Sequence, residues 1–158
     1  MTTREQPWSD DDPASGRIVL LTRNPIAEAI ESIATTVGRP VTVIEQDDEG
    51  AGVAKLAQLA LREGDAVVLC DHDAPDVPEA MRAALASPAS YVAMMASRRR
   101  AEGLLDQLTQ EGVPGLEKLH VPAGLNTGGK APGEIALSVV AEVVACSYNR
   151  DGGSMGRS

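Results

Sequence analysis

Short apolar runs alternate with amphipathic stretches along most of this chain of 158 residues. Continuous apolar runs rich in β-branched residues are typical of strands that are buried on both faces, and apolar residues at a spacing of three or four predict helices. The runs predict strands over 17–22, 40–45, 65–70, 90–95 and, more weakly, 116–122. The helical spacing predicts helices over 25–38, 53–64, 76–86, 98–111 and 132–145.

Residues at the ends of these stretches support the same boundaries. Pro25 suits a first helical turn, and Gly38 and Gly64 suit the ends of helices. Asp76 and Ser97 are candidate N-caps, because their side-chain oxygens can accept a hydrogen bond from the first turn.

The strict alternation of strand and helix predicts an α/β fold. We expect a Rossmann-like three-layer αβα sandwich with a mostly parallel five-stranded sheet. The usual doubly wound connection gives the strand order 3-2-1-4-5, in which the chain reverses between the first and fourth strands. Ligands bind at such a reversal, so the candidate crevice is lined by residues 22–25 and 96–99.

The two ends of the chain differ from the middle. Residues 1–15 are polar and acidic, and residues 148–158 are rich in Gly and Ser, so both are predicted to be disordered tails. The predicted domain is therefore 16–147. No apolar run approaches the roughly 20 residues that would span a bilayer, and the first residues lack the apolar core of a signal peptide.

Composition narrows the classes of partner. A net charge of −9 disfavours binding to nucleic acid or to an anionic membrane. One Trp, two Tyr and no Phe leave no platform for stacking bases. The two cysteines, Cys70 and Cys146, lie far apart and suggest no disulfide framework, so a reducing cytoplasmic compartment is expected.

Three arginines stand in the first turn of the predicted helix 98–111. This is the positive end of the helix dipole, where anions are favoured and cations are not. One interpretation is a solvated basic face. The other is a phosphate or similar oxyanion held by helix N–H groups and by Arg98 or Arg99, with Arg100 toward solvent, since successive helical residues diverge by about 100°.

The first strand-to-helix turn departs from the usual dinucleotide fingerprint. Thr22 and Asn24 stand where glycines would let a pyrophosphate approach the backbone, and only Ala27 fits the pattern. Glu45 ends the second strand, where a ribose-binding carboxylate would lie. A remodelled or empty nucleotide site is therefore favoured over a standard one.

The turn after the third strand reads CDHDAPD. Its spacing matches no structural zinc site, because a second Cys or His pair is missing. His72 and Asp73 are candidates to bind or polarise a ligand, and the alternative is a plain polar loop. Cys70 is expected to be a small buried residue and not a reactive thiol.

The loop GLNTGGKAP precedes the last helix and contains three glycines and a lysine. Such a loop can turn several N–H groups inward to form an anion nest. It is not a Walker A loop, because Ala131 follows Lys130. On the helix, Glu134, Ser138 and Glu142 recur every four residues, as a solvent stripe or as a polar seam for a partner, and the helix's apolarity elsewhere raises the possibility of a homodimer.

Three segments resemble one known family. VVLCDHDAPDVPEAMRAAL, YVAMMASRRR and HVPAGLNTGGKAPGEIALSVVAEVVA are similar to the C-terminal Rossmann-like domain of the XdhC/CoxI family, over about residues 17–146. These are accessory proteins of molybdenum hydroxylases such as xanthine dehydrogenase and carbon monoxide dehydrogenase. The matching positions are His72-Asp73, Ser97-Arg98-Arg99, Pro122, Gly124-Leu125, Gly128, Pro132, Glu134-Ile135-Ala136-Leu137-Ser138 and Ala141-Glu142.

The resemblance implies a Rossmann-like fold and a cofactor-handling chaperone with little or no catalysis of its own. It implies that molybdenum cofactor, a phosphorylated pterin often extended by a nucleotide, is bound transiently and handed to a molybdenum hydroxylase subunit. A protein that carries the family's N-terminal domain is a second expected partner. The candidate cofactor-binding residues are Thr22, Asn24, Glu45, His72, Asp73, Ser97, Arg98, Arg99, Gly124, Leu125, Asn126 and Gly128, with no metal ligand.

The sequence also departs from the family pattern. The Gly-x-Gly-His loop after the first strand is replaced by residues 22–25, the Gly before Ser97 by Ala96, and the Asp after Gly-Leu by Asn126. Two alternatives from other classes therefore stay open. One is an NAD(P)-binding oxidoreductase, and the other is a degenerate Rossmann domain that acts as a protein-interaction module.

Overall fold

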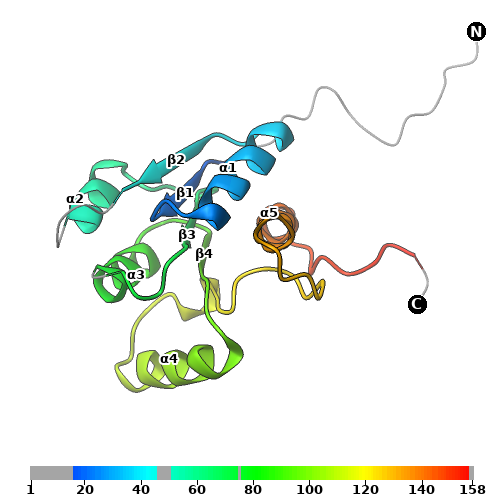
Figure 1. Ribbon diagram of the computed structural model, residues 1–158. Helices are drawn as coiled ribbons and strands as arrows, with labels where there is room; N and C mark the ends of the chain where they lie inside the picture. The colour runs from blue at the N-terminus through cyan, green and yellow to red at the C-terminus, as the bar shows by residue number, and fades with distance from the viewer. Residues whose placement is uncertain (1–15, 46–50, 75, 157–158) are drawn as a thin grey trace, which may run out of the picture.

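The structure is a computed structural model that describes residues 16–45, 51–74 and 76–156. Strands and helices alternate along it as the sequence predicts (Figure 1). The strands are β1 (Ile18–Leu21), β2 (Val41–Ile44), β3 (Ala66–Leu69), β4 (Tyr91–Met94) and β5 (Leu119–His120). The helices are α1 (Pro25–Val37), α2 (Ala51–Gln58), α3 (Val77–Ala86), α4 (Arg98–Gln110) and α5 (Pro132–Ser147), with a short 3-10 turn at Leu116–Lys118.

The five strands form one parallel sheet in the order β2-β1-β3-β4-β5. The predicted Rossmann-like αβα fold is confirmed, but the predicted order 3-2-1-4-5 is not observed. β3 joins β1 on the side away from β2, so the chain reverses between β1 and β3. Both orders use right-handed crossovers, and strand runs alone do not reveal which edge receives the third strand.

Helices cover both faces of the sheet. α1 and α5 pack on one face, and α2, α3 and α4 pack on the other (Figure 1). Alternate strand residues divide between the two cores: Ile18 and Leu20 contact the first group, and Val19 and Leu21 the second. The reversal of the chain after β2 explains this division, because right-handed crossovers in opposite directions place their helices on opposite faces.

One predicted helix end and one predicted cap bond are not observed, and each difference has a long-range cause. α2 ends at Gln58 and not at Gly64, because the Arg17 guanidinium takes the carbonyls of Leu59 and Ala60 that a longer helix would use. Asp76 precedes α3 but makes no cap bond to it. Its carboxylate instead accepts the Gly52 N–H, at 3.0 Å, in the first turn of α2.

Near the predicted limits of the domain, β1 begins at Ile18 and α5 ends at Ser147. Residues 148–156 form no helix or strand, and their predicted disorder stays a prediction. The predicted tail at 1–15 lies outside the described residues. Within the ranges that the structure describes, no helix is both long and apolar enough to cross a bilayer.

Candidate functional site

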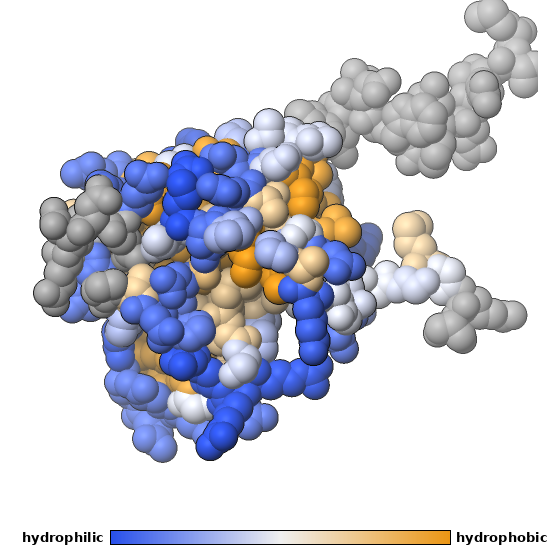
Figure 2. All heavy atoms as spheres, viewed as in Figure 1, coloured by the Kyte–Doolittle hydropathy of each residue, from blue (hydrophilic) through white to orange (hydrophobic). Residues whose placement is uncertain are grey.

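A cleft of about 490 Å³ opens at the carboxyl end of the sheet, between α4 and the loop 122–130. In Figure 2 hydrophilic side chains rim this region and more apolar atoms lie behind them. The cleft joins segments that are far apart in sequence: the start of α1, the turn from β4 into α4, the loop, and one face of α5. Its lining is Ile26, Met95–Arg98, Pro122–Lys130, Ile135 and Ser138.

The start of α4 forms one wall of the cleft. Ser97 is the N-cap, as predicted, and its Oγ accepts the Arg100 N–H at 3.2 Å. Arg98 lines the cleft and Arg99 does not. Within the described part of the chain, neither guanidinium has a hydrogen bond or ion pair. Arg100 was expected to face solvent, and it remains half-exposed while lying 3.6 Å from Asp73.

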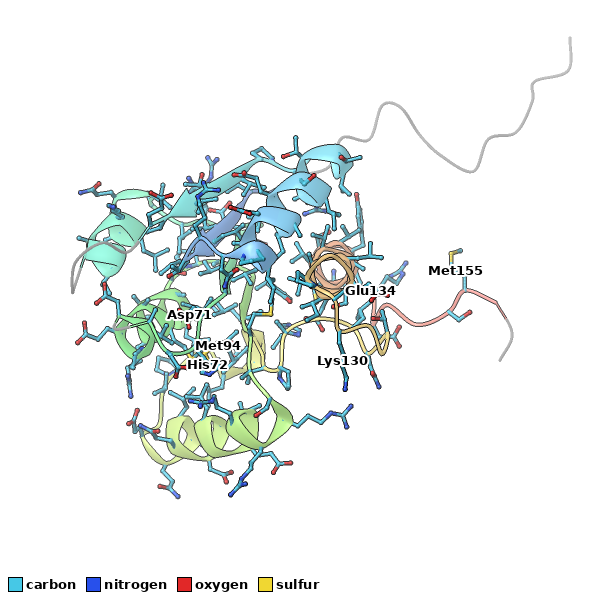
Figure 3. All side chains as sticks on the ribbon, in the orientation of Figure 1. Asp71, His72, Met94, Lys130, Glu134 and Met155 are labelled. Atoms are coloured by element: carbon cyan, nitrogen blue, oxygen red, sulfur yellow. The ribbon has the colours of Figure 1, made fainter. Side chains whose placement is uncertain are left out.

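The charge of the cleft is opposite to the charge of the protein. Arg98 and Lys130 line it, and no Asp or Glu is among its described lining residues, although the whole chain carries −9. Figure 3 shows Lys130 extending from the loop. A cleft lined by one sign of charge concentrates ligands of the opposite sign, so this one favours anions.

The loop is fixed to α5 through Ser138 and Glu142, two of the three polar residues that recur every four positions. Gly124 donates its N–H to Glu142 Oε1 at 3.0 Å, and Leu125 donates to the Ser138 carbonyl at 3.2 Å. Ser138 is buried, and the Glu142 side chain is 14% exposed. The predicted solvent stripe or partner seam is therefore wrong for these two residues, which bind the chain's own loop.

Only part of the predicted anion nest has free donors. The N–H groups of Gly124 and Leu125 are used in anchoring the loop, and the Thr127 N–H donates to the Leu125 carbonyl. The N–H groups of Asn126 and Gly128 have no acceptor among the residues described. Asn126 and Gly128 both line the cleft, so these two N–H groups are the part of the predicted nest that can bind an anion there.

The candidate residues of the first loop lie outside the cleft. Asn24 caps α1 by accepting the Ala27 N–H at 2.8 Å, and its amide donates to the Cys70 carbonyl at 3.0 Å. This side chain thus bridges the ends of β1 and β3, at the point where the chain reverses. Glu45 is exposed and pairs with Arg23 at 2.8 Å. Thr22, which precedes Arg23 in the chain, is half-buried.

His72 and Asp73 lie on the other side of the sheet end. His72 lines a second cleft, of about 260 Å³, between α3 and α4, where Figure 3 shows it near Met94. Its Nδ1 is 3.1 Å from the Met95 carbonyl and must carry a proton to bond there, while Nε2 is 3.3 Å from Asp73. The structure therefore does not bring His72 and Arg98 into one site.

Cys70 behaves as the sequence predicts. It is 4% exposed at the end of β3. Burial, together with the charge of Asp71, raises the pKa of its thiol to about 12. It therefore stays protonated and inert at neutral pH.

Sequence reasoning missed several parts of the cleft. Lys130 lies in the loop that was predicted to hold an anion, but it was not named among the candidate residues, although its cationic side chain was a signal for that role. The apolar floor of Ile26, Met95 and Ile135 gave no such signal, because these residues read as ordinary core positions.

Comparison with known proteins identifies relatives. Residues 18–143 match the family described as the XdhC Rossmann domain. YqeB of Escherichia coli (strain K12), an uncharacterized protein, is 38% identical over 79 residues, which are 49% of this chain and 15% of YqeB. A crystal structure of a xanthine dehydrogenase from Bacillus halodurans has the same fold, with a TM-score of 0.69 and 21% identity over 89% of this chain and 45% of that chain. This chain spans less than half the length of either relative.

Proposed function

From the premise that this chain belongs to the XdhC family through its Rossmann domain, we propose that it is an accessory protein of a molybdenum hydroxylase. In this proposal it holds molybdenum cofactor by its phosphate end in the cleft between α4 and the loop 122–130. One observation carries the proposal: the cleft is lined by Arg98 and Lys130 and by no described carboxylate, in a protein of net charge −9.

The residues of the cleft suit a phosphorylated pterin. Arg98 can form paired hydrogen bonds with phosphate oxygens, and Lys130 adds a second positive charge. The first N–H groups of α4 point in the direction that favours an anion. The apolar floor is suited to a flat ring, as in most small-molecule sites. The cofactor would bring the molybdenum chemistry, and this chain would bind, orient and protect it.

The first loop weighs against a standard NAD(P) oxidoreductase. Asn24 already occupies the Ala27 N–H that a pyrophosphate would meet at the start of α1. Glu45, the candidate ribose ligand, is paired with Arg23. An interaction module without a ligand would need no cationic cleft, although binding to a partner protein is compatible with one.

The proposed partner is a molybdenum hydroxylase subunit, met in the cytoplasm. The free thiols Cys70 and Cys146 agree with a reducing compartment. A partner that carries the family's N-terminal domain remains part of this proposal.

The test is the amount of cofactor that copurifies with the protein from a host that makes it. Molybdenum is measured by mass spectrometry and pterin by fluorescence after oxidation. We expect both with the wild-type protein and a loss of about tenfold with Arg98→Ala, since a charge-assisted hydrogen bond contributes about 1.5–3 kcal/mol. Arg99→Ala is the matched control, because it removes the same charge from the same helical turn outside the cleft.

Other results would point to other functions. If Arg98→Ala and Arg99→Ala retained equal amounts of molybdenum and pterin, the cleft would not be the site that binds the cofactor. Capture of a molybdenum hydroxylase subunit without any pterin would favour the interaction module. Tight binding of NAD or NADP, measured by calorimetry, would favour the oxidoreductase.

A further inference from the structure

A second group of reactive side chains gathers around the C-terminal half of α5. Cys146 Sγ lies 3.8 Å from Nε2 of His120, and Nδ1 of the same ring lies 3.6 Å from Glu142 Oε2. Cys146 and Glu142 are one turn apart on α5, and His120 comes from β5. Sulfur, imidazole and carboxylate thus stand in the order of a nucleophile, a general base and the group that orients the base.

The imidazole is held in the orientation that a base needs. The Tyr91 ring stacks on it with centroids 4.5 Å apart and planes 21° apart, and the Tyr91 hydroxyl donates to Glu142. A carboxylate facing Nδ1 favours the tautomer with its proton there, which leaves the Nε2 lone pair toward the thiol. Burial alone would raise the pKa of Glu142, but bonds from His120, Tyr91 and Gly124 outweigh it and lower that pKa. Glu142 is therefore ionised at neutral pH.

The thiol is accessible from a cleft of its own. Cys146 is partly exposed and lines a cleft of about 270 Å³ at the amino end of the sheet, opposite the cationic cleft. The titratable groups on this lining are Arg39, Glu63, Asp65, Tyr91 and Cys146. Burial and the charge of Glu142 raise the pKa of Cys146. Its resting state is therefore the thiol, and its reactivity depends on a base that removes the proton during attack.

We propose that Cys146 is a nucleophilic thiol, activated by His120, that exchanges with small disulfides. His120 Nε2 takes the proton as Sγ attacks one sulfur of the disulfide, and the S–S bond of the disulfide breaks. Cys146 and one half of the reagent form a mixed disulfide, and the other half leaves as a thiolate that takes the proton from His120. Cys146 is oxidised as the leaving half is reduced, and Glu142 stabilises the transient imidazolium. The proposal does not depend on cofactor binding.

The test follows the reaction of the native full-length protein with the neutral probe 4,4′-dithiodipyridine at pH 7. Release of pyridinethione gives the rate, and peptide mass mapping gives the site. We expect Cys146 to react about tenfold faster in the native protein than in the urea-unfolded protein, a part of what a general base usually contributes. Cys70, which is buried, serves as the internal control and reacts only as the protein unfolds.

Two variants assign the base. His120→Gln should bring the native rate of Cys146 below its rate in the unfolded chain, and that rate should rise steadily into alkaline pH as hydroxide replaces the base. Glu142→Gln keeps an oxygen for the Gly124 N–H but loses the charge, so its rate should be intermediate. A native Cys146 that reacts more slowly than the unfolded one would overturn the proposal. An unchanged rate in a folded Glu142→Gln protein would do the same even if His120→Gln failed to fold.

Discussion

Gly124 is the single residue on which the shape of the cationic cleft depends most. Its φ is 102°, and a Cβ at this position would lie 2.4 Å from Ser138 Oγ. Both the backbone conformation and the close approach to α5 therefore require glycine. The N–H of Gly124 is also the donor that binds Glu142.

We expect Gly124→Ala to lower the free energy of unfolding by about 1–3 kcal/mol, as for other strained backbone positions. Urea denaturation measures it. Gly103→Ala is the matched control: a Cβ there meets no atom within 4 Å in the middle of α4, so it should stabilise the protein by about 0.5–1 kcal/mol. Equal effects of the two substitutions would show that the loop can relax away from α5.

Glu142 should make stability depend on pH in one direction. Its pKa is below the usual value in the folded protein, so its stabilisation is present above the unfolded pKa and is lost as pH falls through the folded one. We expect the difference in unfolding free energy between wild type and Glu142→Gln to be constant near neutral pH and to shrink below about pH 5. Denaturation at a series of pH values checks this, and a difference that grew in acid would contradict the lowered pKa.

At the scale of elements, local sequence signals predicted which segments form helices and strands. Contacts with distant residues determine where some of these elements end. The caps at Ser97 and Gly38 are confirmed, because an N-cap or C-cap depends only on its own helix. The end of α2 could not be predicted, because it is set by Arg17, which lies 42 residues from Leu59. The strand order likewise depends on how helices pack on the two faces and not on any one strand.

Asp76 gives a test at this scale, because it stands beside one helix and binds another. Asp76→Ala should cost about 1–3 kcal/mol by leaving the Gly52 N–H without its buried acceptor. Amide hydrogen exchange should speed up in the first turn of α2 and stay unchanged at the start of α3. Faster amide exchange confined to α3 would instead show that Asp76 acts as the N-cap of α3, as the sequence predicts.

The candidate sites divide in the same way between local and distant information. The arginine turn could be recognised from the sequence by its charge, and the glycine loop by the backbone flexibility of its glycines. That Arg98 and not Arg99 lines the cleft depends on how α4 is placed in the fold, which the sequence of the turn does not give. Glu142 and Cys146 share one helix face, but nothing in the sequence showed that His120 from β5 lies between them.

At the scale of the whole molecule, α5 connects the two clefts. Glu142 binds the Gly124 N–H at one side and faces His120 at the other, so the loop of the cationic cleft and the thiol share one carboxylate. Cys146 Sγ lies beside His120, and His120 faces Glu142, so a group attached to Cys146 can disturb both side chains. Chemistry at one end of the sheet is therefore expected to affect binding at the other.

We expect a mixed disulfide at Cys146 to weaken binding of pyrophosphate, a probe for the cationic cleft. The loss should not exceed about tenfold, since one hydrogen bond contributes about 0.5–1.5 kcal/mol. Calorimetry on untreated, modified and re-reduced protein measures it, and reduction should restore the affinity. Because coupling between two sites is reciprocal, saturating pyrophosphate should disfavour the mixed disulfide at equilibrium by the same factor. Cys146→Ser exposed to the same reagent controls for reaction elsewhere. An unchanged affinity in the modified protein would mean that the loop keeps its anchor and that the two clefts act independently.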